Sequence, residues 1–222
     1  MVYCGAKCQK AAWKAGHKNE CKAYKIENHP DYGRFLVATR ELKPGSKILT
    51  KLQPAVVGPP LINPNYECQS VYMKTCNSKE LNQLLAKLPK PNLQIISPLT
   101  FLLLEKSSPK NFDQLLKLES HTEELKKSER WNDLKKNVID PLIEISGESE
   151  DKITNLVGIL CTNSFELLSH AKGKVPFNGL FELASLMNHD CIGNTRLAND
   201  FIQIRIKSCL QRKVPISVTH FL

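Results

Sequence analysis

The stretch LASLMNHDCIGNTR, residues 183–196, decides how the rest of the chain is interpreted. An apolar run ends at Met187, and the polar residues Asn188, His189 and Asp190 follow it directly. Asn, Asp and Gly favour turns because they tolerate unusual backbone angles or hydrogen-bond the local backbone. Taken alone, the stretch predicts only a polar turn after a helix. Other segments of the chain have to indicate whether this stretch also has a functional role.

Strand patterns near both ends of the chain flank a long helical middle. Apolar residues alternate in YGRFLVATR (32–40), a Pro44–Gly45 turn follows, and KILT (47–50) continues, which predicts two short strands. Alternation returns in FIQIRI (201–206). The proline-rich segment 53–65 is expected to be an extended surface connection. Apolar stripes at helical spacing predict helices at residues 8–24, 78–88, 97–106, 109–131, 133–145 and 149–169, the last of which runs into a shorter element.

The composition indicates a soluble intracellular protein. Of the 222 residues, 41% are hydrophobic, which is enough to build a core. No run approaches the roughly 18 apolar residues of a membrane span, and the start of the chain has no apolar signal segment. Eight cysteines in a reducing compartment are expected to be metal ligands or buried thiols, not disulfides.

Most of the net charge of +9 lies in residues 1–51, which hold eleven basic and four acidic residues. A basic segment suits nucleic acid or acidic protein partners. A solvated face of lysines explains the charge as well. Aromatic residues do not interleave with the lysines as a surface for base stacking requires. We therefore do not expect nucleic acid as a partner.

Three cysteines and a histidine near the start of the chain have the types and spacing of zinc ligands. Cys4-x3-Cys8 is one short-spaced pair and His17-x3-Cys21 is another, one helical turn apart. The alternative is a helix that buries Cys8, Trp13 and Cys21 against a core. The segment is short and rich in lysine, so it needs a staple to fold. The residues therefore favour zinc.

The run YC-x3-CQ-x3-W-x3-H-x3-C resembles the second half of a MYND finger, in which eight ligands hold two zinc ions. The resemblance rests on Cys4, Cys8, Gln9, Trp13, His17 and Cys21. It implies that Cys4 and Cys8 complete one zinc site. It also implies that His17 and Cys21 complete the other, with the first halves of both sites preceding Met1. We therefore expect a partial MYND finger at residues 1–24 that binds zinc loosely. Cys68 and Cys76 are either a remnant of a second finger or buried thiols.

The stretch 183–196 resembles the N-H-S-C-x-P-N segment of SET-domain lysine methyltransferases. YGRFLVATRELKPGSKIL (32–49) resembles the first strands of that domain, and CTNSFEL (161–167) resembles its N-x-F segment. Residues 97–131 resemble the helical region of SET-and-MYND (SMYD-type) proteins. A finger in front of the first SET strands resembles the arthropod branch of that family.

The resemblance covers nearly the whole chain and implies an α+β fold. It implies a SET-domain β-core at residues 30–222, split by a helical insertion at about 78–150, together with the partial finger. The post-SET segment is expected to be missing, so that the chain looks truncated at both ends.

The resemblance also implies a site for S-adenosylmethionine. Gly33 and Arg34 match the first-strand loop that lies against the cofactor. Asn163 matches an asparagine that lines it. Asn188 and His189 match the pair that holds the amino-acid and adenine parts of the cofactor.

Three positions depart from the family pattern or extend it. Phe35 stands where the family usually has a second glycine, so the loop would lose freedom for a positive φ. His220, in KVPISVTHFL, stands in the place of the tyrosine whose hydroxyl orients the accepting amine, and it is the candidate catalytic residue. Cys191 matches a ligand of a third zinc ion. No cysteine cluster follows it, so a third zinc is not expected.

The sequence thus predicts an S-adenosylmethionine-dependent protein-lysine methyltransferase that acts on a histone tail or another lysine-bearing protein. A role in transcription regulation at chromatin, a location in nucleus and cytoplasm, and zinc as a second cofactor are implied with it, and no membrane partner is expected. The alternative is a catalytically inactive SET-and-MYND scaffold that binds proline-containing peptides through its finger, because His220 replaces the expected tyrosine.

Overall fold

The computed structural model describes residues 5–17, 23–30, 33–50, 52–61, 79–88, 92–168, 176–190, 192–197, 203–206, 215 and 217–218. The chain divides into two compact units. Residues 1–52 and 186–222 form what we call the strand unit, and residues 53–185 form the helical unit. Among the described residues, no helix is long and apolar enough to cross a membrane.

The strand unit begins with a short helix. Helix α1 (Ala6–Ala12) continues into one π-helical turn, η1 (Trp13–His17). The helix predicted at 8–24 is thus present up to His17. At its other end the prediction is wrong, because Tyr24 already begins a strand.

That strand belongs to a hairpin that was only half predicted. Strand β1 (Tyr24–His29) pairs antiparallel with β2 (Gly33–Ala38), with Tyr24 opposite Ala38 and His29 opposite Gly33. The last four residues of β2 are all buried, so both faces of this strand are covered. The alternation that predicted β2 from the sequence therefore understates how deeply the strand lies in the core.

A five-stranded sheet completes the strand unit, in the order β3-β9-β8-β10-β7. Its strands are β3 (Lys47–Thr50), β7 (Asn188–His189), β8 (Thr195–Leu197), β9 (Gln203–Ile206) and β10 (Ser217–Val218). The turn before β3 is the predicted one. Ser46 N–H donates to the Lys43 carbonyl over 3.0 Å, and Gly45 has the positive φ of 79° that a type II turn requires.

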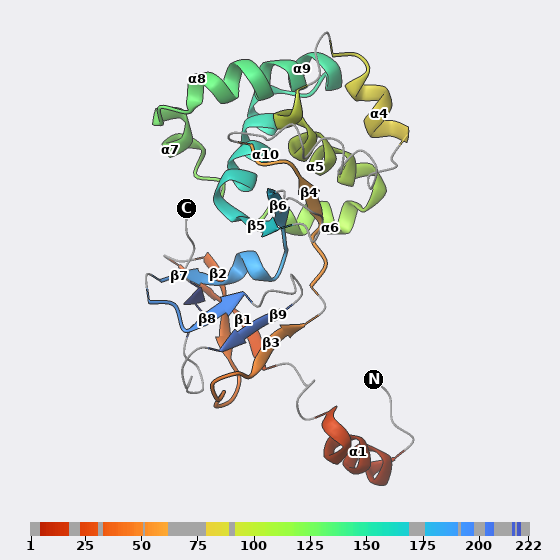
Figure 1. Ribbon diagram of the computed structural model, residues 1–222, viewed down its shortest axis with the longest axis vertical. Helices are drawn as coiled ribbons and strands as arrows, with labels where there is room; N and C mark the ends of the chain where they lie inside the picture. The colour runs from red at the N-terminus through yellow and green to blue at the C-terminus, as the bar shows by residue number, and fades with distance from the viewer. Residues whose placement is uncertain are drawn as a thin grey trace. The chain divides into compact units, whose positions relative to one another are not determined.

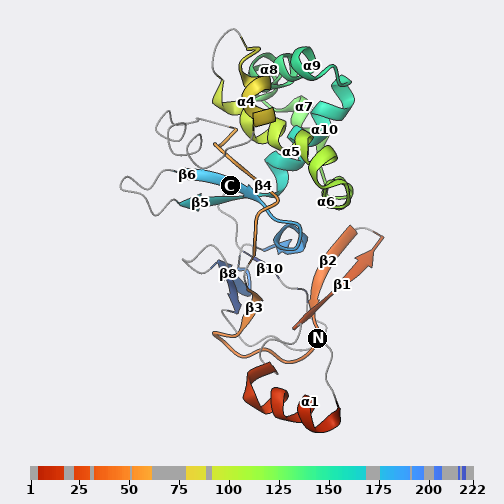
Figure 2. The ribbon, with the colours of Figure 1, turned by 90° about the vertical axis from the view of Figure 1, so that its right-hand side faces the viewer.

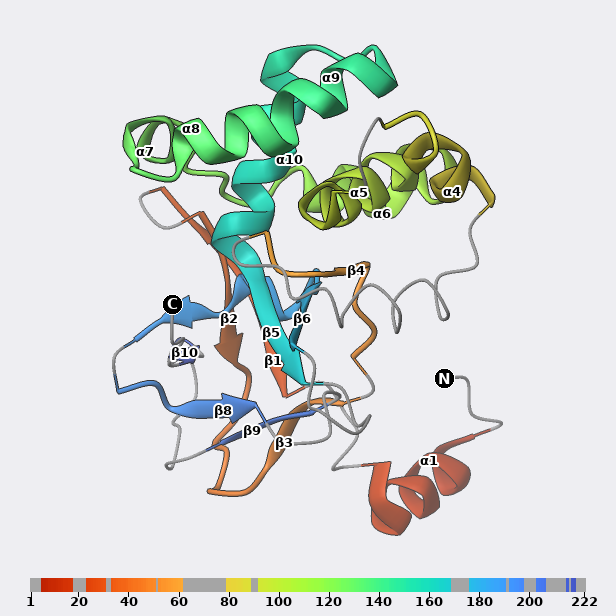
Figure 3. The same cartoon turned by 45° about the horizontal axis from the view of Figure 1, so that its top comes forward.

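The helical unit is built around one central helix (Figures 1 and 3). Helix α10 (Glu150–Asn163) contacts α5 (Ile96–Ser107), α7 (Thr122–Lys127), α9 (Asp140–Ser146) and the π-helical turn η3 (Lys135–Ile139). The remaining helical elements are α4 (Lys79–Leu85), η2 (Leu93–Ile95), α6 (Pro109–Leu115) and α8 (Trp131–Leu134). Ser149 caps α10 by accepting a hydrogen bond from Lys152 N–H. These elements confirm the helical middle that the sequence predicted.

A small antiparallel sheet lies on one side of these helices, in the order β4-β6-β5 (Figure 2). Its strands are β4 (Val56–Gly58), β5 (Ser164–Leu168) and β6 (Pro176–Leu180). Helix α10 runs directly into β5, as predicted. The segment 53–65 was expected to be a surface connection, and this is wrong for its described part. Val56 and Leu61 are buried, because β4 packs against α5.

Candidate functional site

The pair Asn188–His189 forms strand β7 at one end of the five-stranded sheet. A turn of 3-10 helix, η4 (Ala184–Leu186), precedes it. Strand β10 pairs with β7 in parallel, with Ser217 opposite Asn188 and Val218 opposite His189. The bare reading of this stretch as a polar turn after a helix is therefore wrong at these two residues, since long-range strand pairing extends the backbone here.

The polar turn follows one step later. The Asp190 carboxylate accepts a hydrogen bond from Ile192 N–H at 2.9 Å, and Gly193 N–H donates to the Asp190 carbonyl at 3.0 Å. The turn leaves the Ile192 side chain 89% exposed. Cys191, the match to a third zinc ligand, lies outside the described residues.

Side chains from the end of this turn bind the C-terminal strand. The Asn194 side-chain amide donates to the Pro215 carbonyl and accepts from Ser217 N–H, each at 3.0 Å. Thr195 Oγ1 donates to the Ser217 carbonyl at 2.7 Å. Thr195 and Ser217 are both buried. A bridge between Val37 and Pro215 also joins the hairpin to the residue that leads into β10. The strands that carry Gly33–Arg34 and Asn188–His189 are thereby connected through one C-terminal segment.

Gly33 and Arg34 begin strand β2, opposite His29 and Asn28. Gly33 has a φ of 62°, which favours glycine at this position. Phe35, at the position of the expected second glycine, is buried in regular strand without a positive φ. Phe35 therefore does not restrict the backbone as expected, because the positive φ occurs at Gly33 and not at position 35.

Asn163 lies at the last residue of α10, in the helical unit. Its side-chain amide donates to the carbonyls of Glu119 and Ile159, at 2.7 and 2.9 Å. Its own carbonyl accepts a hydrogen bond from the Ser185 hydroxyl at 3.2 Å. The amide is therefore firmly oriented. Of the five predicted cofactor residues, the other four belong to the strand unit, and their role as a site stays a prediction.

The finger segment is described only in part. Cys8 and Trp13 are exposed, and α1 contains no buried residue. The alternative of a helix that buries these two side chains against a core is therefore wrong. A helix with no core of its own needs another source of stability, and the donor set fits zinc. Cys4 and Cys21 lie outside the described residues, as does the side chain of His17, and no cluster of three metal-ligating side chains occurs within the described part.

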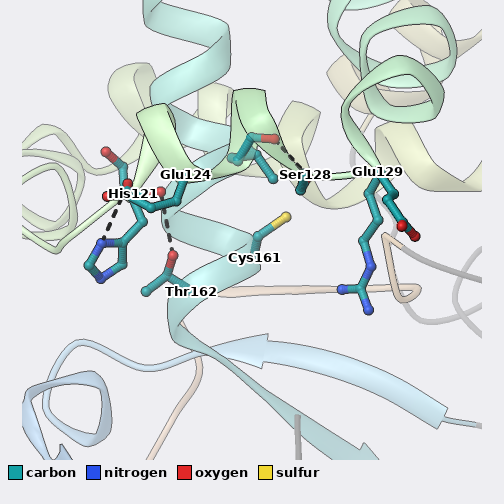
Figure 4. A pocket seen from close by; sticks show the side chains of 9 residues that line it. His121, Glu124, Ser128, Glu129, Cys161 and Thr162 are labelled. Atoms are coloured by element: carbon teal, nitrogen blue, oxygen red, sulfur yellow. Dashed lines mark hydrogen bonds and ion pairs between the residues drawn. The ribbon is translucent and has the colours of Figure 1, made fainter.

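The helical unit contains a pocket of about 360 Å³ that no sequence pattern predicted (Figure 4). It lies between α7, the turn at 128–130 and the end of α10, and its rim carries His121, Glu124, Glu129 and Arg130. The Cys161 thiol points into it. Burial raises the pKa of this thiol to about 11, although the nearby Arg130 guanidinium lowers it. The thiol is therefore protonated at neutral pH and is a poor nucleophile. No local signal marks this pocket, because its walls come from segments far apart in sequence.

His220, the candidate catalytic residue, lies outside the described residues, so its placement stays a prediction. Cys68 and Cys76 also lie outside the described residues.

Comparisons with known proteins bear on both parts of the chain. Residues 1–21 match the family model of the MYND finger. The fold is similar to the SET domain of LSMT bound to lysine and AdoHcy, with a TM-score of 0.50 and 16% identity over 96% of this chain and 53% of that chain. It is also similar to Rubisco LSMT bound to AdoMet, with a TM-score of 0.51 and 15% identity over 96% of this chain and 52% of that one. No curated protein matches the sequence significantly.

At these identities the structural likeness establishes the fold. The α+β SET-domain fold predicted from the sequence is confirmed, and the chain carries a MYND finger in front of it. A MYND finger implies zinc. The chain spans about half the length of the structures that it matches.

Proposed function

We propose that this protein is an S-adenosylmethionine-dependent protein-lysine methyltransferase of the SET-and-MYND type. The observation that carries the proposal is strand β7. The Asn188–His189 pair lies in a parallel pairing with the C-terminal strand, within a fold that is similar to a SET domain bound to lysine and AdoHcy. Fold alone does not carry activity, so the residues of the site have to support the proposal.

The chain's own residues fit the cofactor. Gly33 has a positive φ of 62°, and Asn188 and His189 offer backbone polar groups in strand β7. Asn163 is a further candidate by resemblance alone, since it belongs to the helical unit and its side-chain nitrogen already donates to the Glu119 and Ile159 carbonyls. When bound, S-adenosylmethionine would supply an activated methyl group. The residues around it would hold a neutral lysine amine in line with that group, because alignment alone can contribute several kcal/mol.

The substrate is a lysine-bearing protein, and a histone tail and a role in transcription regulation in nucleus and cytoplasm belong to the same proposal. A lysine with its usual pKa of about 10.4 has to lose its proton in an apolar channel before transfer. His220 would stand beside this step in the place of the family's tyrosine.

The test uses the full chain. Calorimetry with S-adenosylhomocysteine measures binding, and labelled S-adenosylmethionine with histone and non-histone proteins measures transfer. We expect binding in the wild type, loss of binding in Asn188→Ala, and no change in Ile192→Ala, which alters only an exposed side chain of the neighbouring turn. A wild-type protein that neither binds nor transfers would contradict the proposal.

A second function is favoured by the finger. Helix α1 buries none of its own residues, and the Trp13 ring in the following turn η1 is 45% exposed, so that a partner can contact it. In this case the protein is a scaffold that binds proline-containing peptides. Fluorescence anisotropy with a labelled proline-rich peptide tests it on the full chain. Trp13→Ala should weaken binding at least fivefold, and Lys14→Ala, on the neighbouring exposed position, should not.

The two functions are separated by His220→Tyr. If the SET scaffold is intact but inactive, this substitution restores methyl transfer. If the wild type is already active, His220→Tyr changes the rate of methyl transfer, but methyl transfer does not require the substitution.

A further inference from the structure

The described part of strand β10 consists of Ser217 and Val218. These two residues lie between β7 and β8 in the sheet, and the strand pairs in parallel with both. Parallel pairing is slightly less stable per residue than antiparallel pairing, and a two-residue ladder offers few backbone hydrogen bonds. Other contacts have to keep this strand in the sheet.

Asn194 supplies these contacts with one side chain. Its Nδ2 donates to the Pro215 carbonyl and its Oδ1 accepts from Ser217 N–H, both at 3.0 Å. Both distances are those of good backbone hydrogen bonds. The side-chain amide therefore acts as an additional peptide group that lengthens the ladder of β10 by one unit. The Asn194 backbone N–H adds a hydrogen bond to Ser217 Oγ at 3.3 Å.

Two neighbours support the same strand. Thr195 Oγ1 donates to the Ser217 carbonyl at 2.7 Å, and Ser217 Oγ donates to the Asp190 carboxylate over a longer 3.4 Å. Thr195 is 0% and Ser217 4% exposed. Water therefore does not replace these bonds readily if the strand shifts.

The sheet order gives this clamp its consequence. Strand β7 is the last strand of the sheet, and β10 is its neighbour there. The position of Asn188 and His189 thus depends on β10, and the position of β10 depends on Asn194. We propose that Asn194 is a positioning residue for the cofactor site: its side-chain amide holds β10 in the sheet and so fixes the strand that carries Asn188 and His189. This inference rests on the proposed function.

The test compares two variants at one position with a control in the other unit. Asn194→Ala removes both side-chain hydrogen bonds. Asn194→Asp is isosteric and keeps the acceptor for Ser217 N–H, but places an oxygen against the Pro215 carbonyl. The control is Ser97→Ala, which removes a buried hydrogen bond of 3.0 Å to the Pro59 carbonyl in the helical unit. Calorimetry measures the Kd for S-adenosylhomocysteine on the full chain, and thermal unfolding is recorded for each variant.

We expect Asn194→Ala to weaken binding about tenfold, since two hydrogen bonds hold the strand. Asn194→Asp should weaken it at least threefold. Ser97→Ala should lower the melting temperature to a similar extent but leave the Kd within twofold of wild type. Hydrogen exchange gives an independent readout. The amides of β7 and β10 should exchange faster in Asn194→Ala, and saturating S-adenosylhomocysteine should restore their protection.

The outcomes separate the two levels of the argument. A wild type that does not bind S-adenosylhomocysteine overturns the proposed function and this inference with it. A wild type that binds, with an unchanged Kd in both Asn194 variants, overturns the inference alone. Equal weakening in Ser97→Ala also overturns it, because the effect would then follow general stability. If Asn194→Ala does not fold, Asn194→Asp decides by the same criterion.

Discussion

Two threonines show how differently the two units are held together. Thr195 in the strand unit and Thr154 in the helical unit are 0% and 2% exposed. The Thr195 hydroxyl donates a hydrogen bond of 2.7 Å to the Ser217 carbonyl. The Thr154 hydroxyl has no hydrogen-bond partner in the structure. At these two positions, the strand unit uses a buried hydroxyl to hold a neighbouring strand, whereas the helical unit packs its hydroxyl without a hydrogen bond.

The difference has a physical origin. Helices satisfy their own backbone groups, so the residues between α5 and α10 only need to fill space. The two described residues of β10 form few backbone hydrogen bonds with the neighbouring strands, and side chains add hydrogen bonds to them. We therefore expect the helical unit to respond to changes of volume and the strand unit to respond to changes of polarity at constant volume.

The largest effect is expected where packing is tightest. At Gly158 in α10, an added Cβ would lie 2.4 Å from the backbone oxygen of Ser120. Alanine gains up to about 1 kcal/mol in helix propensity, but overpacking costs about 1–3 kcal/mol, and a backbone oxygen cannot move aside alone. Gly158→Ala should lower the free energy of unfolding by about 2 kcal/mol in urea denaturation.

The matched control is Gly147→Ala. Gly147 has no atom within 4 Å of an added Cβ but has a φ of 74°. It should cost about 1 kcal/mol through backbone strain alone. A stabilising effect of Gly158→Ala would contradict the close packing of α10.

The next effect tests the polar clamp of the strand unit. Thr195→Val keeps the shape of the side chain and removes the hydrogen bond to Ser217. A buried carbonyl then loses a partner, which should cost about 1–2 kcal/mol. Denaturant titration followed by circular dichroism measures the change. An unaltered stability would mean that β10 does not depend on this hydroxyl.

The same substitution should have the opposite sign in the helical unit. Thr154→Val removes a buried hydroxyl that has no partner, so the free energy of unfolding should rise by about 1 kcal/mol. The pair Thr154→Val and Thr195→Val, measured side by side, is the most direct test of the comparison. Two changes of equal sign would refute it.

A smaller effect is expected from the charge cluster on α10. Lys152 Nζ lies 2.8 Å from Glu105 and 3.0 Å from Glu148. Burial lowers the pKa of Lys152, but the hydrogen bonds that its ammonium donates to Glu105 and Glu148 outweigh this effect, so the pKa is raised above 10.5. A raised lysine pKa contributes stability that is complete below the unfolded value and is lost as the pH rises through the folded value.

Lys152→Met should therefore cost about 0.5–1 kcal/mol at neutral pH. The difference from wild type should shrink as the pH rises above about 10.5. Urea titrations at a series of pH values measure it. A difference that persists unchanged at high pH would assign the effect to packing against Phe112, whose ring centroid lies 6.0 Å from Nζ.

The smallest effect concerns Cys161. With a pKa of about 11, only about one thiol in a thousand is ionised at pH 8. Iodoacetamide should label Cys161 slowly in the native protein and much faster in urea, as followed by mass spectrometry of the peptide that contains it. Fast labelling of the native protein would show that the pocket thiol is less buried than the structure indicates.

Local sequence patterns predicted several elements well, because the signals lie within a few residues. Alternation marked β2 and β9, proline and glycine marked the turn at 44–45, and apolar stripes marked the helices of the helical unit. The same rules missed β1. Its residues Lys25, Glu27 and Asn28 are polar, and pairing with β2 makes it a strand.

The candidate site was predictable only through motifs. Asn188 and His189 were found because the surrounding stretch resembles a known segment, and their residue types alone indicated a turn. Asn194 belonged to the same stretch, yet nothing in its neighbourhood pointed to Pro215 and Ser217. The pocket around Cys161 had no signal in sequence at all, since its walls come from residues 120–130 and 161–162.

The sequence by itself determined the order of most helical and strand segments, because periodicity is a local property of the chain, and the resemblance of its motifs implied the class of fold. The finger ligands stay a prediction. Only the tertiary structure decided that β10 enters the sheet between β7 and β8. The contact between Thr195 and Ser217 joins residues 22 positions apart. Such a pairing is selected by hydrogen bonds that exist only after the chain has folded back on itself, and no local pattern encodes it.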